Sequence, residues 1–414
     1  MIVLSHPTGN ANLRAIANSL YRAGQLEAFH TSIATFPGNL WDGLSKLPGM
    51  SDFTRREFPA ELQRLTHQHP WREVGRMVAG KAGIDKLVAH EKGVFSVDQV
   101  YQALDERVAT ALGKKDNVRG VYAYEDGALA TFRAAKERGL KCFYDLPIAY
   151  WQTKGRLIAE EADRYPDWQA TMGGGTGDSA EKLERKTQEL ELADAVVGPG
   201  SFVMDSLPDW AADKHRIVAP FGSPAVPTAT PQRPERPGDR PLRVLFAGSL
   251  TQRKGLADLF AAMRLLDTAA VELVVLGAPR VPLDFYRQQY PDFTYEPTRP
   301  HAGVLDLMAG CDVFCLPSIV EGRALVMQEA MSQGLPVIIT PNTGGADLVI
   351  PDETGFLVPI RSPAAIAESI EWFLANRQEL PRMGQAARRH AATYTWEAYG
   401  DAVVAGIQQY LATH

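Results

Sequence analysis

The chain has 414 residues, of which 45% are hydrophobic and 22% charged, and its formal net charge is −6. This length suggests two domains of roughly 100–200 residues each, and the composition is ordinary for a globular protein. The acidic balance argues against a broadly basic nucleic-acid binder, and we expect no nucleic-acid partner.

The cysteines and the N-terminus bear on the compartment. Cys142, Cys311 and Cys315 form an odd, sparse set, which argues against a disulfide framework and favours buried thiols in a reducing environment. The first residues lack the basic region and apolar core of a signal peptide, and no stretch approaches the ~18 apolar residues of a spanning helix. We therefore predict a cytoplasmic protein, with peripheral contact at the inner membrane face left open.

The first residues predict the start of a doubly wound α/β domain. A short buried strand at 2–5 precedes a loop, then a helix at 11–23 and a strand at 26–35. Such domains begin in this order. Residues 41–115 read as mostly helical and irregular, and they are longer than a simple crossover needs.

A basic amphipathic stretch lies within this irregular region, at residues 71–90. It carries Arg72, Arg76, Lys81 and Lys86 among apolar side chains. A helix of this kind can lie on an anionic membrane. A solvated helix face is the commoner explanation, and we favour it.

The α/β alternation then returns on both sides of a proline-rich segment. In the first half we expect strands at 120–124, 141–144 and 193–197, a helix at 128–138, a flexible glycine loop at 173–177 and a helix capped by Ser201. In the second half we expect strands at 244–247, 271–276, 313–316 and 337–340, with helices at 256–266, 301–310 and 325–333. Short connections between alternating strands and helices predict a parallel sheet covered on both faces.

The proline-rich segment is the clearest boundary in the chain, because such composition makes an extended linker. The expected organisation is therefore an N-terminal domain at 1–222, a linker at 223–240, a second domain at 241–394 and a C-terminal amphipathic helix at 395–414.

A loop in the second half has the chemistry of a diphosphate site. It runs from Gly248 and Ser249 to Gly255, follows a strand and opens a helix. A helix N-terminus offers free backbone N–H groups and a positive dipole end. Arg253 and Lys254 add two cations at the same place.

Two glutamates eight positions apart suggest a second part of the same site. Glu321 stands before a helix and Glu329 stands inside it. A helical rise over eight residues is about 12 Å, comparable to an extended sugar–diphosphate–ribose unit. Glu329 could accept the ribose hydroxyls and Glu321 those of the sugar, while the turn at 322–325 presents N–H groups to phosphate. Two solvated glutamates at a helix start are the alternative reading.

Taken together, these residues resemble the retaining glycosyltransferases of family 4. The resemblance is carried by the loop from Gly248 to Gly255, by residues 309–318, by the Glu321 and Glu329 pair, and by the runs 334–337 and 352–358. It is strong over 242–359, weaker over 1–40 and 120–220, and absent from 41–115. The Arg-Lys-Gly ending of the loop is particularly similar to lipopolysaccharide-core glucosyltransferases.

The resemblance implies the α/β GT-B fold, in which two Rossmann-like domains face each other with parallel sheets across a cleft. It implies retaining transfer of a hexose from a UDP, GDP or ADP sugar to a hydroxyl acceptor, such as a glycan, glycolipid or small molecule, without a metal or other cofactor. The implied donor site comprises Gly248, Ser249, Arg253, Lys254, Glu321, Gly322, Arg323, Ala324, Leu325 and Glu329.

Departures from the family pattern occur in the loop of the expected diphosphate site and on the acceptor side. Many relatives have a cation where this chain has Ser249, and Arg253 then takes its place. Many also have a histidine after an N-terminal strand, where this chain offers Asp145, or Glu125 and Asp126 after the preceding strand. The first loop lacks the usual glycine pair and presents His6, Gly9 and Asn10 to the acceptor.

Other functions stay open at this point. A nucleotide-sugar epimerase or a glycoside phosphorylase has a similar two-domain shape, and a catalytically silent nucleotide-sugar-binding module would keep the same donor residues. A dinucleotide dehydrogenase is disfavoured because neither half carries G-x-G-x-x-G. The sequence leaves the oligomeric state open.

Overall fold

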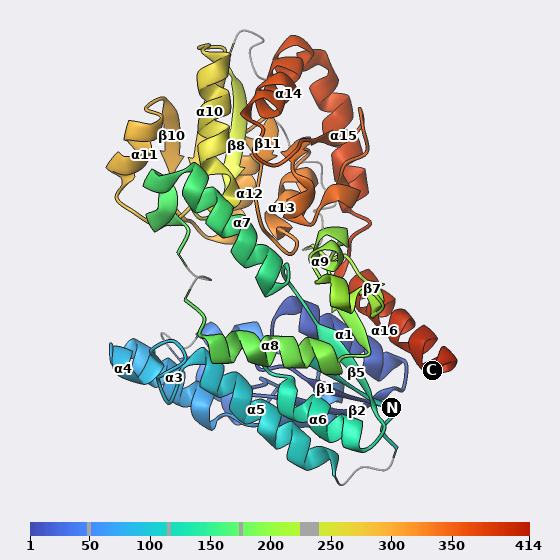
Figure 1. The fold of residues 1–414 in the computed structure, drawn as a ribbon. Coiled ribbons are helices and arrows are strands. Elements are labelled where there is room, and N and C mark those ends of the chain that lie inside the picture. Colours follow the sequence, from blue (N-terminus) through green and yellow to red (C-terminus); the bar gives the residue numbers. More distant parts are fainter. Residues whose placement is uncertain (48–50, 114–116, 174–176, 224–239) are drawn as a thin grey trace.

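The computed structural model describes residues 1–47, 51–113, 117–173, 177–223 and 240–414. The chain forms two α/β domains, each built on one parallel sheet (Figure 1). Residues 224–239 of the linker expected at 223–240, and residues 174–176 of the glycine loop expected at 173–177, lie outside the described residues. Within the described parts, no helix is long and apolar enough to cross a membrane.

The first sheet has seven parallel strands in the order β3-β2-β1-β4-β5-β6-β7. Its strands are β1 (Ile2–Ser5), β2 (Leu26–Thr31), β3 (Thr66–Gln68), β4 (Gly120–Tyr124), β5 (Lys141–Asp145), β6 (Ala195–Gly198) and β7 (His215–Val218). The α-helices of this half are α1 (Ala11–Arg22), α2 (Leu40–Ser45), α3 (Trp71–Lys81), α4 (Asp85–Val88), α5 (Val97–Leu112), α6 (Leu129–Glu137), α7 (Trp151–Arg164), α8 (Ala180–Leu192) and α9 (Ser201–Asp205).

The second sheet has six parallel strands in the order β10-β9-β8-β11-β12-β13. Its strands are β8 (Leu242–Ala247), β9 (Val271–Leu276), β10 (Phe293–Glu296), β11 (Val313–Leu316), β12 (Val337–Ile339) and β13 (Gly355–Leu357). The α-helices of this half are α10 (Leu256–Leu266), α11 (Leu283–Gln289), α12 (His301–Ala309), α13 (Leu325–Ser332), α14 (Pro363–Ala375), α15 (Leu380–Ala391) and α16 (Trp396–Thr413).

The first helix shows how local sequence sets these boundaries. The Asn10 side chain caps α1 by accepting the N–H of Leu13, and Gly24 follows the helix with φ of 65°. The predicted helix at 11–23 is thus confirmed to within one residue. The strand expected at 26–35 ends at Thr31, because from Ser32 onward the chain leaves the sheet and Ala34 bonds to the side chain of Gln68 instead.

The start of α9 differs from its prediction. Gly200, not Ser201, is the N-cap residue, and Ser201 is the first residue of the helix. A Cβ on Gly200 would lie 2.9 Å from the carbonyl oxygen of Gly344, in the second domain. The close approach of the two backbones therefore leaves no room for a capping side chain at this position.

Each half contributes one segment to the other half. Helix α7 and the following 3-10 helix (Pro166–Thr171) come from the first half, yet Ile158 and Trp168 are buried in the core of the second (Figure 1). Conversely, α16 packs on α1 of the first domain, where Val403 and Ile407 are buried. These two exchanged segments, in addition to the linker, therefore connect the domains.

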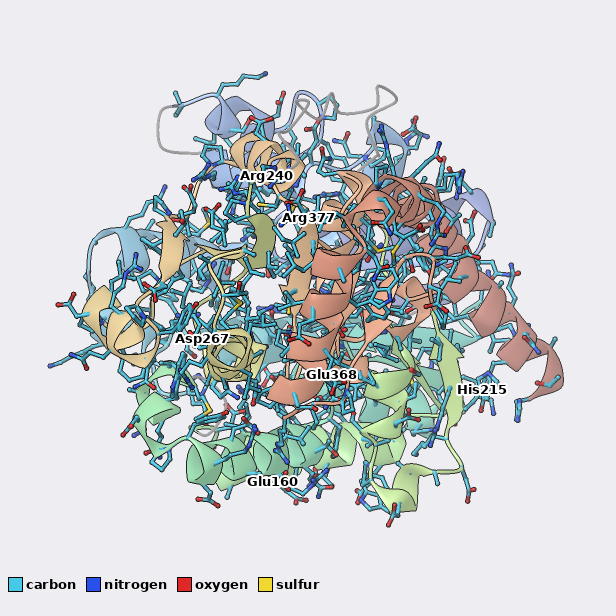
Figure 2. The ribbon with its side chains drawn as sticks, turned by 90° about the horizontal axis from the view of Figure 1, so that it is seen from above. Glu160, His215, Arg240, Asp267, Glu368 and Arg377 are labelled. Carbon is cyan, nitrogen blue, oxygen red and sulfur yellow. The ribbon has the colours of Figure 1, made fainter. Side chains whose placement is uncertain are left out.

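The return of the chain after the linker is held by ionic contacts. The guanidinium of Arg240 binds both carboxylate oxygens of Asp312, and Arg377 donates to the Arg240 carbonyl beside it (Figure 2). These contacts fix the entry into β8 and hence the position of the loop that follows this strand.

Candidate functional site

Arg253, Lys254 and Glu321 meet at the carboxyl edge of the second sheet. The Nζ atom of Lys254 lies 2.7 Å from Oε1 of Glu321, and Nη1 of Arg253 lies 3.0 Å from the same oxygen. The Glu321 side chain is 11% exposed and that of Lys254 12%. Two cations and one carboxylate thus share a half-enclosed site and leave one net positive charge.

A tight turn brings the cationic loop to this place. Thr251 caps the 3-10 turn Gln252–Lys254 with its side chain, and Gly255 ends it with φ of 74°. A Cβ on Gly255 would lie 2.0 Å from the carbonyl oxygen of Pro317, just after β11. The N–H of Ile319 donates to the carbonyl of Arg253, which locks the two loops together.

The turn before α13 has some of its N–H groups already bonded. Glu321 donates to the carbonyl of Asn342, and Ala324 donates to that of Thr343. Helix α13 begins at Leu325, and the N–H of Met327 already donates to the carbonyl of Ala324, so the open donors of its first turn are those of Leu325 and Val326. The open end of α13 therefore provides backbone donors beside the two cations.

Arg323 has a structural position in this turn. Its guanidinium is buried and donates to the carbonyl of Gly344 and to both carboxylate oxygens of Asp347. It also lies over the ring of Tyr394, 4.8 Å from the ring centroid. The Arg323 side chain thus fixes the turn before α13 to the segment that contains Gly344 and Asp347, while its backbone remains part of the turn.

Glu329 lies in the second turn of α13 and has a partner that sequence reasoning missed. The Oε1 atom of Glu329 is 3.1 Å from Nε2 of His301, at the start of α12. Only residues from Leu325 onward are helical, so the helical rise estimated for the glutamate pair applies to half of its span. The signal for His301 was weak because it follows a proline at a helix start, an ordinary surface position.

The two domains touch directly at this site. A Cβ on Gly322 would lie 1.7 Å from the carbonyl oxygen of Pro147, which follows β5 of the first domain. A Cβ on Gly344 would in turn lie 1.6 Å from the carbonyl of Gly322. Ala149 and Ile319, from opposite domains, are buried in one small apolar cluster. The turn that contains Gly322, called the donor loop below, is therefore closed against the first domain by backbone contacts.

A cavity of about 300 Å³ lies beside this contact. Its lining includes Glu125, Ile148, Lys154 and Lys186. Lys186 lies 3.3 Å from Glu125 and pairs with its carboxylate. Burial lowers the pKa of Lys154, and the nearby charges of Lys186 and Arg253 lower it further. The cavity is thus lined by residues of the first half of the chain, and the charge of Arg253 reaches Lys154 in its wall.

His6, Gly9 and Asn10 lie in the loop between β1 and α1. His6 is buried, its ring centroid is 4.4 Å from that of Tyr124, and burial lowers its pKa to about 3. The imidazole is therefore neutral near pH 7. Gly9 packs against Arg56, and Asn10 caps α1.

Asp145 occupies a different environment from Glu125. Its carboxyl group is 2% exposed, and burial raises its pKa to about 7, helped by the charge of Glu125. Its neighbours are Tyr122 of β4 and Tyr399 of α16. Of the carboxyl groups considered for the acceptor side, Glu125 lines the cavity, whereas Asp145 is enclosed by aromatic side chains.

We expect Asp145 to make folding stability depend on pH. The carboxyl stays protonated to about pH 7 in the folded protein, but ionises near its ordinary value of 3.8 in the unfolded chain. Between these values the unfolded chain binds fewer protons, so the free energy of unfolding falls as pH rises, by a few kcal/mol at about 1.4 per pH unit. Asp145→Asn should remove this fall, as measured by denaturant unfolding at several pH values. Parallel pH profiles for the two proteins would contradict the assignment.

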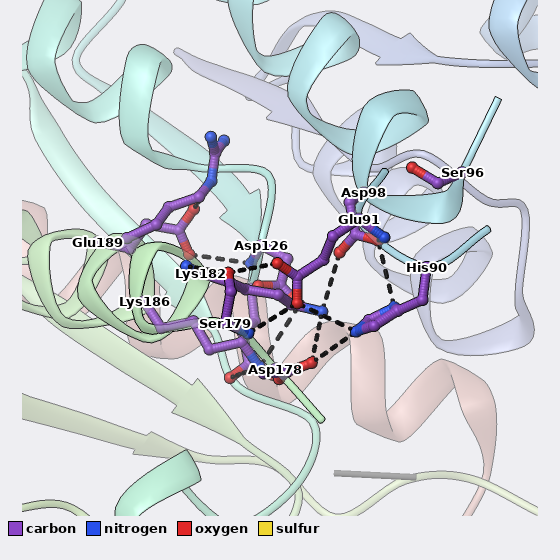
Figure 3. A network of polar contacts seen from close by, with 12 residues as sticks. His90, Glu91, Ser96, Asp98, Asp126, Asp178, Ser179, Lys182, Lys186 and Glu189 are labelled. Atoms are coloured by element: carbon purple, nitrogen blue, oxygen red, sulfur yellow. Dashed lines mark hydrogen bonds and ion pairs between the residues drawn. The ribbon is translucent and has the colours of Figure 1, made fainter. Parts of the chain in front are cut away.

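Within the described residues, His90, Glu91 and Asp178 form the one group with metal-ligand spacing. Lys182 lies inside the same network, with Nζ 3.1 Å from Asp178 and 2.9 Å from Asp98 (Figure 3). The ammonium group already supplies positive charge to these carboxylates. The network therefore ties the start of α8 to the segment around His90.

Comparison with known proteins bears on this arrangement. Residues 229–390, most of the second domain, match the family model described as glycosyl transferases group 1. The solved structure of a sucrose-phosphate synthase from Thermosynechococcus elongatus superposes with a TM-score of 0.63 over 100% of this chain and 99% of its own, at 18% identity. The Anabaena protein HepE, solved in complex with UDP, gives a TM-score of 0.60 over 99% of both chains, at 16% identity. The chain therefore has the GT-B fold, as the resemblance implied.

Curated relatives share part of their length with this chain. A D-inositol 3-phosphate glycosyltransferase from Corynebacterium glutamicum is 29% identical over 249 residues, which cover 53% of this chain and 59% of the relative. One from Streptomyces coelicolor is 36% identical over 120 residues, covering 27% and 26%. The first of these matches spans about three fifths of the relative, and the second about a quarter. The second domain is thus similar to the group 1 glycosyl transferases over the residues that include Arg253, Lys254, Glu321 and Glu329.

Proposed function

We propose that this protein transfers a sugar from a nucleotide-diphosphate sugar to a hydroxyl acceptor, with retention of anomeric configuration. The observation that carries the proposal is the convergence of Arg253, Lys254 and Glu321 beside the open end of α13. Cations and helix N-termini together favour a diphosphate.

In this proposal the leaving diphosphate takes over the two cations. The bond from the anomeric carbon to the phosphate oxygen breaks, and its electron pair goes to that oxygen. Arg253, Lys254 and the N–H groups of the first turn of α13 stabilise the developing charge. Glu321, released from the cations, accepts hydrogen bonds from sugar hydroxyls. The acceptor oxygen bonds to the same face of the sugar, and its proton passes to the leaving phosphate.

The nucleoside end of the donor is assigned to Glu329 and His301. A carboxylate accepts hydrogen bonds from both ribose hydroxyls, and His301 holds one of its oxygens in place. A UDP donor is favoured, since a structural neighbour of this fold was solved with UDP. No metal is required in this arrangement, because the protein cations balance the diphosphate.

The acceptor hydroxyl is assigned to the cavity lined by Glu125, beside the contact between Pro147 and Gly322. Glu125 lines it next to the donor loop, so we place Glu125, rather than Asp145, in contact with the sugar or the acceptor. Asp145 then positions the end of β5, two residues before the contact with Gly322.

An acceptor-dependent assay tests this function against its rivals. Wild-type protein should release UDP from a UDP-sugar faster when a sugar acceptor is present, and the product should keep the anomeric configuration of the donor, as read by proton NMR. Conversion of the UDP-sugar to its epimer without acceptor would favour an epimerase. UDP-sugar binding without turnover, across a broad acceptor panel, would favour a binding module.

A further inference from the structure

A second cavity opens at the loop between β1 and α1, in the first domain. Its volume is about 370 Å³. It is lined by Thr8, Gly9, Asn10, Arg55, Arg56, Arg76 and Met77. The three arginines come from residues 41–115, outside the part of the chain that the family model matches.

The cavity carries an excess of positive charge. Arg56 and Arg76 share the carboxylate of Glu73. It accepts a hydrogen bond from Nη2 of Arg56, and hydrogen bonds of 2.7 Å each from Nε and Nη2 of Arg76. Burial would raise the pKa of Glu73, but the hydrogen bonds and charges of Arg76 and Arg56 outweigh it and the pKa is lowered. Three guanidinium groups therefore line the cavity, and two of them share one ionised carboxylate.

Arg56 has donor capacity that the protein does not use. Its side chain is 11% exposed, and within the described residues its Nη1 atom is buried without a hydrogen-bond partner. The part of the chain that the structure describes therefore satisfies the donors of Arg56 only in part.

The backbone of the loop adds to the attraction for an anion. Helix α1 has twelve residues, and its N-terminal N–H groups open beside Gly9 and Asn10. A Cβ on Gly9 would lie 3.1 Å from Cα of Arg56, so glycine allows the close packing of the loop on the arginine segment. Arg14 holds the two segments together by donating to the carbonyl of Gly9 and to that of Arg55.

We propose that this cavity binds the phosphate group of a phosphorylated acceptor, a sugar or polyol phosphate. The lining of three arginines suits a phosphate monoester, because guanidinium groups bind its oxygens in pairs. A helix N-terminus is a further phosphate-binding element. This inference rests on the proposed function in one respect, namely that the bound molecule is the acceptor.

The position of the cavity favours the acceptor over the donor. The donor cations Arg253 and Lys254 belong to the second domain. The cavity follows β1, and ligands of parallel sheets bind beyond the carboxyl ends of the strands. That edge of the first sheet also carries Glu125 after β4 and Pro147 after β5, and Pro147 touches the donor loop. A phosphate held at α1 would therefore direct the rest of the acceptor along the edge toward the donor.

Binding of simple probes to the UDP-saturated protein tests the proposal without requiring turnover. Inorganic phosphate, glucose 6-phosphate, glucuronate and glucose would be titrated by calorimetry into wild type, Arg55→Gln and Arg76→Gln. Arg76 holds the buried Glu73, so Arg76→Gln could lose stability. Arg55 is exposed, so we expect Arg55→Gln to keep the fold even in that case. Arg64→Gln removes an exposed arginine of the 3-10 helix Ala60–Leu65 and serves as the control.

We expect glucose 6-phosphate to bind wild type at least about tenfold more tightly than glucose, and Arg55→Gln to lose about tenfold of that affinity, as for one charge-assisted hydrogen bond. Glucuronate should bind more weakly than glucose 6-phosphate, and UDP affinity should be unchanged in every variant. Absence of binding by both phosphate probes, or equal losses in Arg55→Gln and Arg64→Gln, would overturn the proposal. If the phosphates bind as expected but UDP does not, the proposed function fails while the anion site stands.

Discussion

Lys254→Ala should reduce sugar transfer by about tenfold to a hundredfold, since one charge-assisted hydrogen bond contributes about 1.5–3 kcal/mol and each ~1.4 kcal/mol is a factor of ten in rate. The Nζ atom lies 2.7 Å from Glu321, in the position assigned to the leaving diphosphate. The measurement is the initial rate of acceptor-dependent UDP release at saturating donor.

The fold should survive this substitution, because Glu321 keeps Arg253 as a partner at 3.0 Å. Lys46→Ala is the matched control, as Lys46 is a 71% exposed lysine paired within its own helix end. Normal turnover by Lys254→Ala would remove the lysine from the mechanism and with it the assignment of this loop to the diphosphate.

Gly322→Ala should lower transfer strongly by preventing the contact between the domains. Its Cβ would lie 1.7 Å from the carbonyl oxygen of Pro147, and two backbones cannot both keep their places at that separation. Domain closure completes the catalytic site in enzymes of two lobes. We expect a loss on the order of a hundredfold in kcat, because a displacement of about 1 Å costs that much.

The control for this variant is Gly43→Ala, since no atom lies within 4 Å of a Cβ on Gly43 in α2. A smaller effect on the affinity for UDP than on kcat would locate the damage in closure rather than in the donor pocket. If Gly322→Ala retains wild-type turnover, the closed contact plays no part in catalysis.

The regular core of the fold could be predicted from the sequence. Strands buried on both faces read as short apolar runs, and β4, β9 and β11 lie where those runs were found. The helix α10 likewise begins and ends as expected. These predictions succeeded because burial on two faces and capping residues are local signals.

The exchange of segments between domains could not be predicted. An amphipathic helix shows that it packs on something, but Ile158 of α7 and Val403 of α16 bear no mark of which domain buries them. That choice depends on three-dimensional complementarity over more than a hundred residues of chain.

The residues of the site in the second domain could be predicted from the sequence, whereas the arginines of the first domain could not. The structure brings Arg253, Lys254 and Glu321 into contact, because each stands just after a strand of one parallel sheet. Arg55 and Arg56 reach Gly9 from the end of a short 3-10 helix (Ser51–Arg56), where no period or motif links them to the loop after β1. Long-range juxtapositions of irregular segments leave no trace in one sequence.

The most direct test of the account is calorimetric titration of wild type and Glu329→Ala with UDP, GDP and ADP in the absence of metal. We predict micromolar binding of one nucleotide, UDP in the first instance, and at least about a tenfold loss in the variant, as for one charge-assisted hydrogen bond. The substitution removes the 3.1 Å contact between Glu329 and His301, and we expect the fold of the variant to stay intact. Failure of all three nucleotides to bind wild-type protein would contradict a nucleotide-diphosphate site at α13.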